Sequence, residues 1–422
     1  MKKALLFTLL IIFSTISFAQ NTSKENSLKD LKLIQNKHRN FDNKIEREIY
    51  DRNFKSLEYS IEKGFTKDQF IVDKNFTNFI QKIFSEITRA NISYQLNNPN
   101  FFIVKNNIPN ASSFGFDYYM LYYGLFNLAE NEYQIAAVLG HEMAHNYLNH
   151  SIEEIKQEAS FLIDFKKEIK SIKKQEFIRL IKSQDEIIQK KYDLANQSRI
   201  KEIAADSLGF VFYSNANFPK SEYLEMLNRL DQYNTKNTII LKDSTYYNLF
   251  SSAGISINPK WLKLEKEELF AGLTFTEHVD QDSVKTHPNT NERKQWIAKK
   301  FKVENIKTDV VKPSVEFIQL KNKVVEDFYN TMFLNDSFGD ALYLLFNEKQ
   351  NKSERNDLDK NIGIAFTKLH EARLKHEFNK YVTIADANDE DADYHKFLNF
   401  LWNLSTNDLK IIGEYYTKKT AE

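Results

Sequence analysis

The stretch from Asn131 to His150 constrains this chain most, because it places ionisable groups inside the pattern of a buried helix. It reads NEYQIAAVLGHEMAHNYLNH, with no proline and a single glycine. Apolar residues recur through it at helical spacing, which predicts a largely buried helix of about five turns. The side chains of His141, Glu142 and His145 cannot be buried in such a helix without partners.

His141 and His145 stand four residues apart, so a helix places both on one face with about 5–6 Å between their Cβ atoms. Two neutral imidazoles at that separation can bind one zinc ion at about 2.0–2.1 Å. Glu142 is turned by about 100° around the helix axis, where it can hold a zinc-bound water instead of binding the metal. A chance match to this H-E-x-x-H pattern is the alternative, and burial of the helix favours the zinc site.

A catalytic zinc ion normally has three protein ligands and one open position. Glu202 and Asp206 stand four residues apart at the start of a second apolar helix, so they also share a face. One carboxylate can bind zinc while the other accepts a hydrogen bond from a ligand imidazole. A pair of solvated helix acids is the alternative. His150 comes one residue too early for the longer zinc motif with three histidines, and we expect it at the helix end, where a cation suits the helix dipole.

The first 19 residues follow the plan of a secretory signal peptide. Lys2 and Lys3 form a basic segment and Ala4 to Phe13 an apolar one. Ser17 and Ala19 are the two small residues of a small-x-small cleavage site. The apolar run is shorter than the roughly 20 residues that span a bilayer. We therefore expect cleavage after residue 19 and export to the periplasm or out of the cell, with no transmembrane segment in the mature chain.

Composition excludes several classes of function. The chain has 58 basic and 58 acidic residues, which gives no electrostatic reason to expect nucleic acid or an anionic membrane as a partner. It has no cysteine, so disulfides, thiol catalysis and thiolate metal sites are all excluded. Its 34 Phe and 21 Tyr supply large side chains for a core.

The remaining patterns predict a mainly helical, α+β protein with a small antiparallel sheet. Residues 75–90 have the periodicity of an amphipathic helix, and residues 101–104 and 116–123 read as two strands just ahead of the zinc helix. An edge strand beside the metal could bind a peptide by strand addition, or it could simply cover the core.

Three spaced motifs resemble those of the HtpX and CAAX-prenyl-protease type of gluzincin, peptidase family M48. They are HEMAHNYLNH, the E-x-x-A-D segment from Glu202 to Asp206, and Thr286-His287-Pro288 followed by Arg293. The segment from Pro109 to Gly115 sits where that family has its Asn-Ala strand. The resemblance covers about residues 75–300 and implies a zincin-like helical metallopeptidase domain with a small sheet.

The resemblance implies one zinc ion per chain, with His141, His145 and Glu202 as ligands. It also implies that Glu142 is the general base that takes a proton from the attacking water. Asp206 would then be the carboxylate that orients a ligand imidazole.

The third motif supplies two further candidates. We expect His287 to donate a hydrogen bond to the tetrahedral oxyanion, since Pro288 favours an extended backbone that projects the histidine side chain. Arg293 could orient that histidine or clamp an acidic neighbour. A loop histidine without a role is the alternative, and a latent form with His287 in the open zinc position is a further hypothesis.

The implied activity is peptide-bond hydrolysis, and we expect Asn110, Ala111 and Ser112 to contact a polypeptide substrate. Misfolded or unfolded envelope proteins are the substrates that the resemblance implies. The contrasting hypothesis is a latent or inactive homologue that acts as a binding or chaperone-like protein. The membrane helices of the prenyl-protease branch have no counterpart here, so prenylated substrates are not expected.

We expect four regions along the chain. They are a signal peptide (residues 1–19), an N-terminal helical arm (20–72), a zinc metallopeptidase domain (73–301) and a helical C-terminal region (316–422) that could bind a partner protein. Within the third region, residues 151–197 predict a long helical excursion, either a structural strut or a lid. Residues 237–284 look irregular and could shape the substrate cleft.

Overall fold

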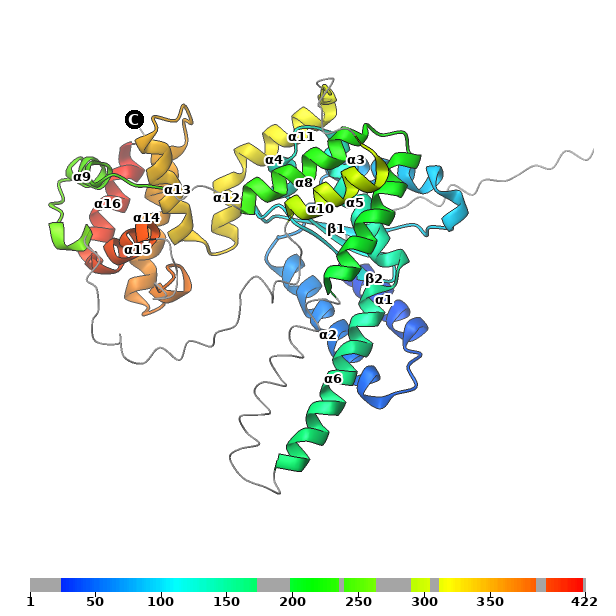
Figure 1. The fold of residues 1–422 in the computed structure, drawn as a ribbon. Coiled ribbons are helices and arrows are strands. Elements are labelled where there is room, and N and C mark those ends of the chain that lie inside the picture. Colours follow the sequence, from blue (N-terminus) through cyan, green and yellow to red (C-terminus); the bar gives the residue numbers. More distant parts are fainter. Residues whose placement is uncertain are drawn as a thin grey trace, which may run out of the picture.

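The computed structural model of the chain is mostly helical and has one small mixed sheet, which confirms the expected α+β class (Figure 1). It describes residues 24–172, 198–234, 239–262, 290–303, 311–384 and 392–419. The expected signal peptide and His287 lie outside these residues.

The sheet has three strands in the order β1-β3-β2, formed by β1 (Asn100–Val104), β2 (Ala111–Gly115) and β3 (Tyr118–Tyr122). β1 runs parallel to β3, and β2 runs antiparallel to β3. The prediction of an antiparallel sheet was therefore wrong for β1 and β3. Between them the chain runs in the opposite direction through β2, so β1 and β3 point the same way. The residue pattern of β2 did not indicate a strand, since its letters ASSFG have little of the β-branched character typical of strands. The family resemblance had placed a strand in the segment from Pro109 to Gly115, and β2 lies there.

Alternating residues of β3 face two different layers of helices, as the period of two in a strand requires. Tyr119 and Leu121 pack into the core that contains α3 and α5, whereas Tyr118 and Met120 pack against α1, α2 and α6. The arm that precedes the motifs therefore covers the second face of the sheet. These helices are α1 (Lys24–His38), α2 (Lys44–Thr66), α3 (Lys74–Ala90), α5 (Glu132–Tyr147) and α6 (His150–Ile172).

The predicted long helix through the H-E-x-x-H motif is in fact two helices. Asn131 caps the start of α5, because its side chain accepts a hydrogen bond from the backbone N–H of Gln134 at 3.2 Å. The helix ends at Tyr147, and Asn149 adopts a left-handed backbone conformation with φ of 57°. Asparagine tolerates that conformation, so the chain changes direction and α6 begins at His150.

A helix over residues 198–215 crosses α5 beside the motif histidines. A Cβ atom at Gly209 of this helix would lie 2.8 Å from the Cα atom of His141, so only glycine allows the two backbones to come this close. Further helices complete the same core around them. They are α4 (Gly124–Leu128), α8 (Lys220–Asn234), α10 (Thr290–Phe301) and α11 (Val315–Glu326).

A second lobe, on the left in Figure 1, has its own apolar core. Residues 239–262 belong to this core, although we expected them to be irregular and to shape the substrate cleft. Tyr246 and Phe250 are fully buried there, and each makes an edge-on contact with Phe400. The helices of this lobe are α9 (Asp243–Ser251), η2 (Pro259–Leu262), α13 (Phe338–Gln350), α14 (Leu358–Leu374), η4 (Phe378–Lys380), α15 (Ala392–Asn403) and α16 (Thr406–Lys419), and α12 (Phe328–Leu334) leads into it.

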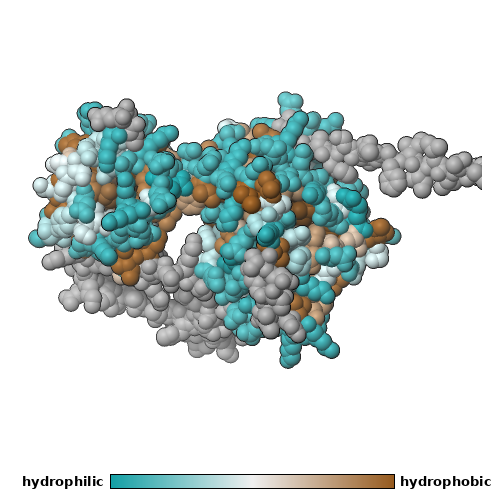
Figure 2. Space-filling model, turned by 90° about the horizontal axis from the view of Figure 1, so that it is seen from above, coloured by the Kyte–Doolittle hydropathy of each residue, from teal (hydrophilic) through white to brown (hydrophobic). Residues whose placement is uncertain are grey.

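Hydrophilic residues cover most of the face seen in Figure 2, and hydrophobic residues appear there in scattered patches. No helix in the described part of the chain combines the length and the apolar character needed to cross a membrane.

We predict that Gly209→Ala destabilises the protein by about 1–3 kcal/mol, because the added methyl group would overpack the contact with α5. Helix propensity alone would make this substitution stabilising by about 1 kcal/mol, so a loss would report the close approach of the two helices. Denaturant unfolding measures the change. Ile200→Ala, at an exposed position of the same helix, is the control and should stay within about 0.5 kcal/mol of wild type. A Gly209→Ala protein as stable as wild type would contradict this account.

Candidate metal centre

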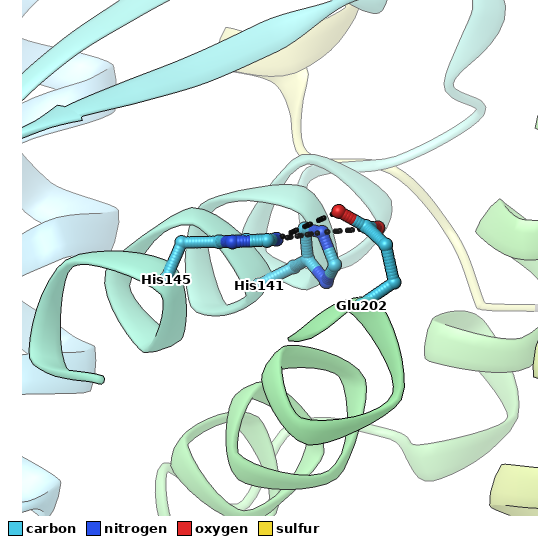
Figure 3. Close-up of side chains that lie close together, drawn as sticks. All are labelled: His141, His145 and Glu202. Atoms are coloured by element: carbon cyan, nitrogen blue, oxygen red, sulfur yellow. Dashed lines mark hydrogen bonds and ion pairs between the residues drawn. The ribbon is translucent and has the colours of Figure 1, made fainter. Parts of the chain in front are cut away.

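Side chains from two helices converge on one point. His141 and His145 project from α5, and Glu202 projects toward them from the helix over residues 198–215 (Figure 3). The two Nε2 atoms lie 3.0 Å apart, and the carboxylate oxygens of Glu202 lie 3.5 Å from Nε2 of His141 and 3.2 Å from Nε2 of His145. A tetrahedral zinc ion with bonds of about 2.0–2.1 Å holds its ligand atoms about 3.3 Å apart. These three side chains therefore fit one such ion.

The other ring nitrogen of His141 contacts a buried ion pair. Its Nδ1 lies 3.0 Å from Oδ1 of Asp206, and Arg293 of α10 donates two hydrogen bonds to that carboxylate, each of 2.7 Å. Burial would raise the pKa of Asp206, but the hydrogen bonds and charge of Arg293 lower it to about 2. Asp206 is therefore an anion that accepts the Nδ1 proton of His141 and leaves Nε2 free for a metal.

A proton and a metal ion compete for His141. Burial lowers the pKa of His141, but its hydrogen bonds with Asp206 and Glu202 outweigh this effect and raise the pKa to about 10. A bound cation would replace that proton and be attracted by the same two carboxylates.

His150 supports the second histidine, a role that sequence reasoning missed. Its Nδ1 lies 2.8 Å from Nδ1 of His145, and its side chain is buried. Burial, and then the charges of His145 and Lys201, lower the pKa of His150 to about 4, so the ring is neutral. It can accept the Nδ1 proton of His145 and fix the tautomer that offers Nε2 to a metal.

The expectation of a cationic His150 at a helix end was wrong. Because the chain turns at Asn149, His150 is the first residue of α6, where the positive end of the helix dipole disfavours a cation. The only signal in the sequence was the spacing of five residues between His145 and His150. In one continuous helix, that spacing would place His150 away from the metal, so His150 can reach His145 only because the helix ends between them.

Glu142 is half-buried on α5 beside His141. Two buried tyrosines, Tyr119 and Tyr223, lie near Glu142. Burial raises the pKa of both phenols, and the negative charges of neighbouring carboxylates, including Glu142, raise it further. Tyr223 donates a hydrogen bond of 3.3 Å to the backbone carbonyl of Asp206. Glu142 therefore lies at the same polar centre as the metal-binding group.

The expected substrate-binding residues lie at the start of the sheet edge nearest to α5. Ala111 and Ser112 open β2, which contacts α5, and Asn110 precedes it and accepts a hydrogen bond of 2.9 Å from the backbone N–H of Tyr122. The turn after β2 is tied to α5 by Asn146, next to His145. Its side chain exchanges hydrogen bonds of 3.0 and 2.6 Å with the backbone N–H and the carboxylate of Asp117.

A family model described as "Peptidase family M48" matches residues 75–300, just over half of the chain. The match includes the strands, the three candidate metal ligands and Arg293. It excludes α1, α2 and the helices of the second lobe that follow residue 300. A search among curated proteins found no match.

We predict that His150→Ala weakens zinc binding by about 10–100-fold, because the buried Nδ1–H of His145 would lose its acceptor. His150→Asn is the matched control, since its amide oxygen can take the place of Nδ1, and it should recover most of the affinity. Competition with a chromogenic chelator measures both dissociation constants. Equal zinc affinity in His150→Ala and wild type would refute the supporting role.

Proposed function

Because this chain belongs to peptidase family M48 and is therefore a metallopeptidase, we propose that it is a zinc-dependent endopeptidase. The observation that carries the proposal is the convergence of His141, His145 and Glu202. Nitrogen and oxygen ligands of this kind, with a position left for water, are typical of catalytic zinc. A purely structural site usually has four protein ligands.

The reaction that we propose begins with Glu142. His141, His145 and Glu202 would hold the zinc ion, which would act as a Lewis acid and lower the pKa of a bound water to about 7. Glu142 accepts the proton of the attacking water and then donates it to the leaving amine. Asp206 and His150 hold the two imidazoles in the tautomers that leave Nε2 unprotonated. On sequence grounds His287, outside the described residues, remains our candidate donor to the oxyanion.

An extended polypeptide is the substrate that this arrangement favours. β2 is an edge strand, paired with β3 on one side only. Its other side can pair with the backbone of a substrate segment, so that main-chain hydrogen bonds hold the peptide beside α5. Folded proteins rarely offer such a segment, whereas misfolded chains do. The signal-peptide pattern of residues 1–19 supports a site of action in the cell envelope or outside the cell.

We predict that Glu142→Gln abolishes hydrolysis of unfolded casein, with a loss of at least about 100-fold, because the amide cannot accept the proton of water. Zinc content should stay near one ion per chain in wild type and variant, since neither ligand histidine nor Glu202 changes. Metal analysis beside the protease assay separates the outcomes. Zinc in both proteins without cleavage by either would favour the latent or chaperone-like alternative, and no zinc in either would refute the proposal.

A further inference from the structure

A partly open cavity of about 290 Å³ lies between the N-terminal arm and the sheet. Its walls come from α1, α2, the end of β2, the following turn and the first turn of α6. Aromatic rings form much of the lining, namely those of Tyr50, Phe54, Phe114, Phe116 and Tyr118. Serine and asparagine side chains of α2, among them Asn53 and Ser56, stand at its exposed side.

This cavity lies at the end of the strand that we propose to bind substrate, and α6 links it to the metal-binding group. Ser151, which lines it, follows His150 in the chain, and His150 contacts the metal-binding His145 at 2.8 Å. Ser151 also packs under Gly115 at the end of β2, where an added Cβ atom would lie 3.1 Å from the Cβ atom of Ser151. Ser113, Phe114 and Gly115 line the cavity, so one end of a peptide that pairs with β2 would lie beside it.

The end of β2 is irregular where it meets the cavity. The pairing with β3 slips between Ser113 and Gly115, so Phe114 bulges from the strand, and this residue is 37% exposed. The next two residues, Phe116 and Asp117, both have positive φ, which is rare for a bulky residue such as phenylalanine. Bulges at sheet edges commonly redirect side chains beside active sites.

One wall carries a polar group with nothing to bind. Tyr118 is 3% exposed, and its hydroxyl has no hydrogen-bond partner in the described part of the chain. Such a buried hydroxyl loses its hydration without compensation unless a ligand or water supplies a partner. The rings that line the cavity suit an aromatic side chain, which packs edge-on or offset against them.

We propose that this cavity is a specificity pocket that binds a large aromatic side chain of the polypeptide substrate, several residues from the bond that is cleaved. The proposal rests on the endopeptidase function proposed above. The volume is at the lower limit for sites that hold drug-sized ligands, so it suits one side chain rather than a separate small molecule. Since α1 and α2 lie outside the family match, substrate selection here depends on a part of the chain that the family model does not include.

Binding to the Glu142→Gln protein tests the pocket without hydrolysis. A labelled host peptide of Ser, Gln and Ala carries one tyrosine, which is moved through each position. At one position, tyrosine should bind at least about tenfold more tightly than alanine, as measured by fluorescence anisotropy. Adding Ser56→Trp, which fills the cavity from α2, should reduce that ratio to near one and leave the alanine peptide unaffected.

Lys55→Trp is the matched control, because Lys55 is the exposed neighbour of Ser56 and does not line the cavity. It should bind the tyrosine peptide as the Glu142→Gln protein does. No preference at any position, or a preference that survives Ser56→Trp, would overturn the pocket. Failure of the wild type to cleave any peptide would instead overturn the endopeptidase function, and the binding ratio would still decide the pocket.

Discussion

The contact between α5 and the helix over residues 198–215 is the constraint on which the rest of the site depends. Neither helix alone supplies all three candidate metal ligands, since one supplies the imidazoles and the other the carboxylate. The backbones meet at Gly209, beside His141, and one face of the second helix then presents Glu202 and Asp206 to both ring nitrogens of that histidine. The surrounding apolar core holds the two helices at this distance, so packing sets the geometry that the chemistry needs.

The two candidate ligand histidines are supported in different ways. His141 depends on a charged partner, Asp206, which is itself neutralised by Arg293 from α10. His145 depends on a neutral one, His150, from the start of α6. Together these contacts balance the charge of the buried Asp206 carboxylate and give each Nδ1 atom a hydrogen-bond partner. The site therefore needs side chains from four helices, namely α5, the helix over residues 198–215, α6 and α10, although the H-E-x-x-H motif lies in α5 alone.

Local patterns predicted much of this site, and long-range geometry accounts for the errors. Spacings of four residues were enough to bring His141 to His145 and to align Glu202 with Asp206, because helical periodicity fixes which side chains share a face. The sequence could not show that Asn149 turns the chain and sends His150 back to His145. It also could not show that β1 and β3 are parallel, or that residues 239–262 join a distant core, because these features depend on contacts between remote segments.

The path of the chain between its two cores has a consequence for folding. Residues 198–234 belong to the first core, 239–262 to the second, 290–326 to the first wherever they are described, and the helices after residue 334 to the second. The aromatic face of α9 is therefore synthesised before the helices that bury it, and Arg293 reaches Asp206 only after that detour. The two cores therefore cannot be completed one after the other as the chain is synthesised. Each core needs residues that come later in the chain than part of the other core. Asp206 and Arg293 come together only after residues 239–262 have been made, which ties the assembly of the candidate metal centre to a late stage of synthesis.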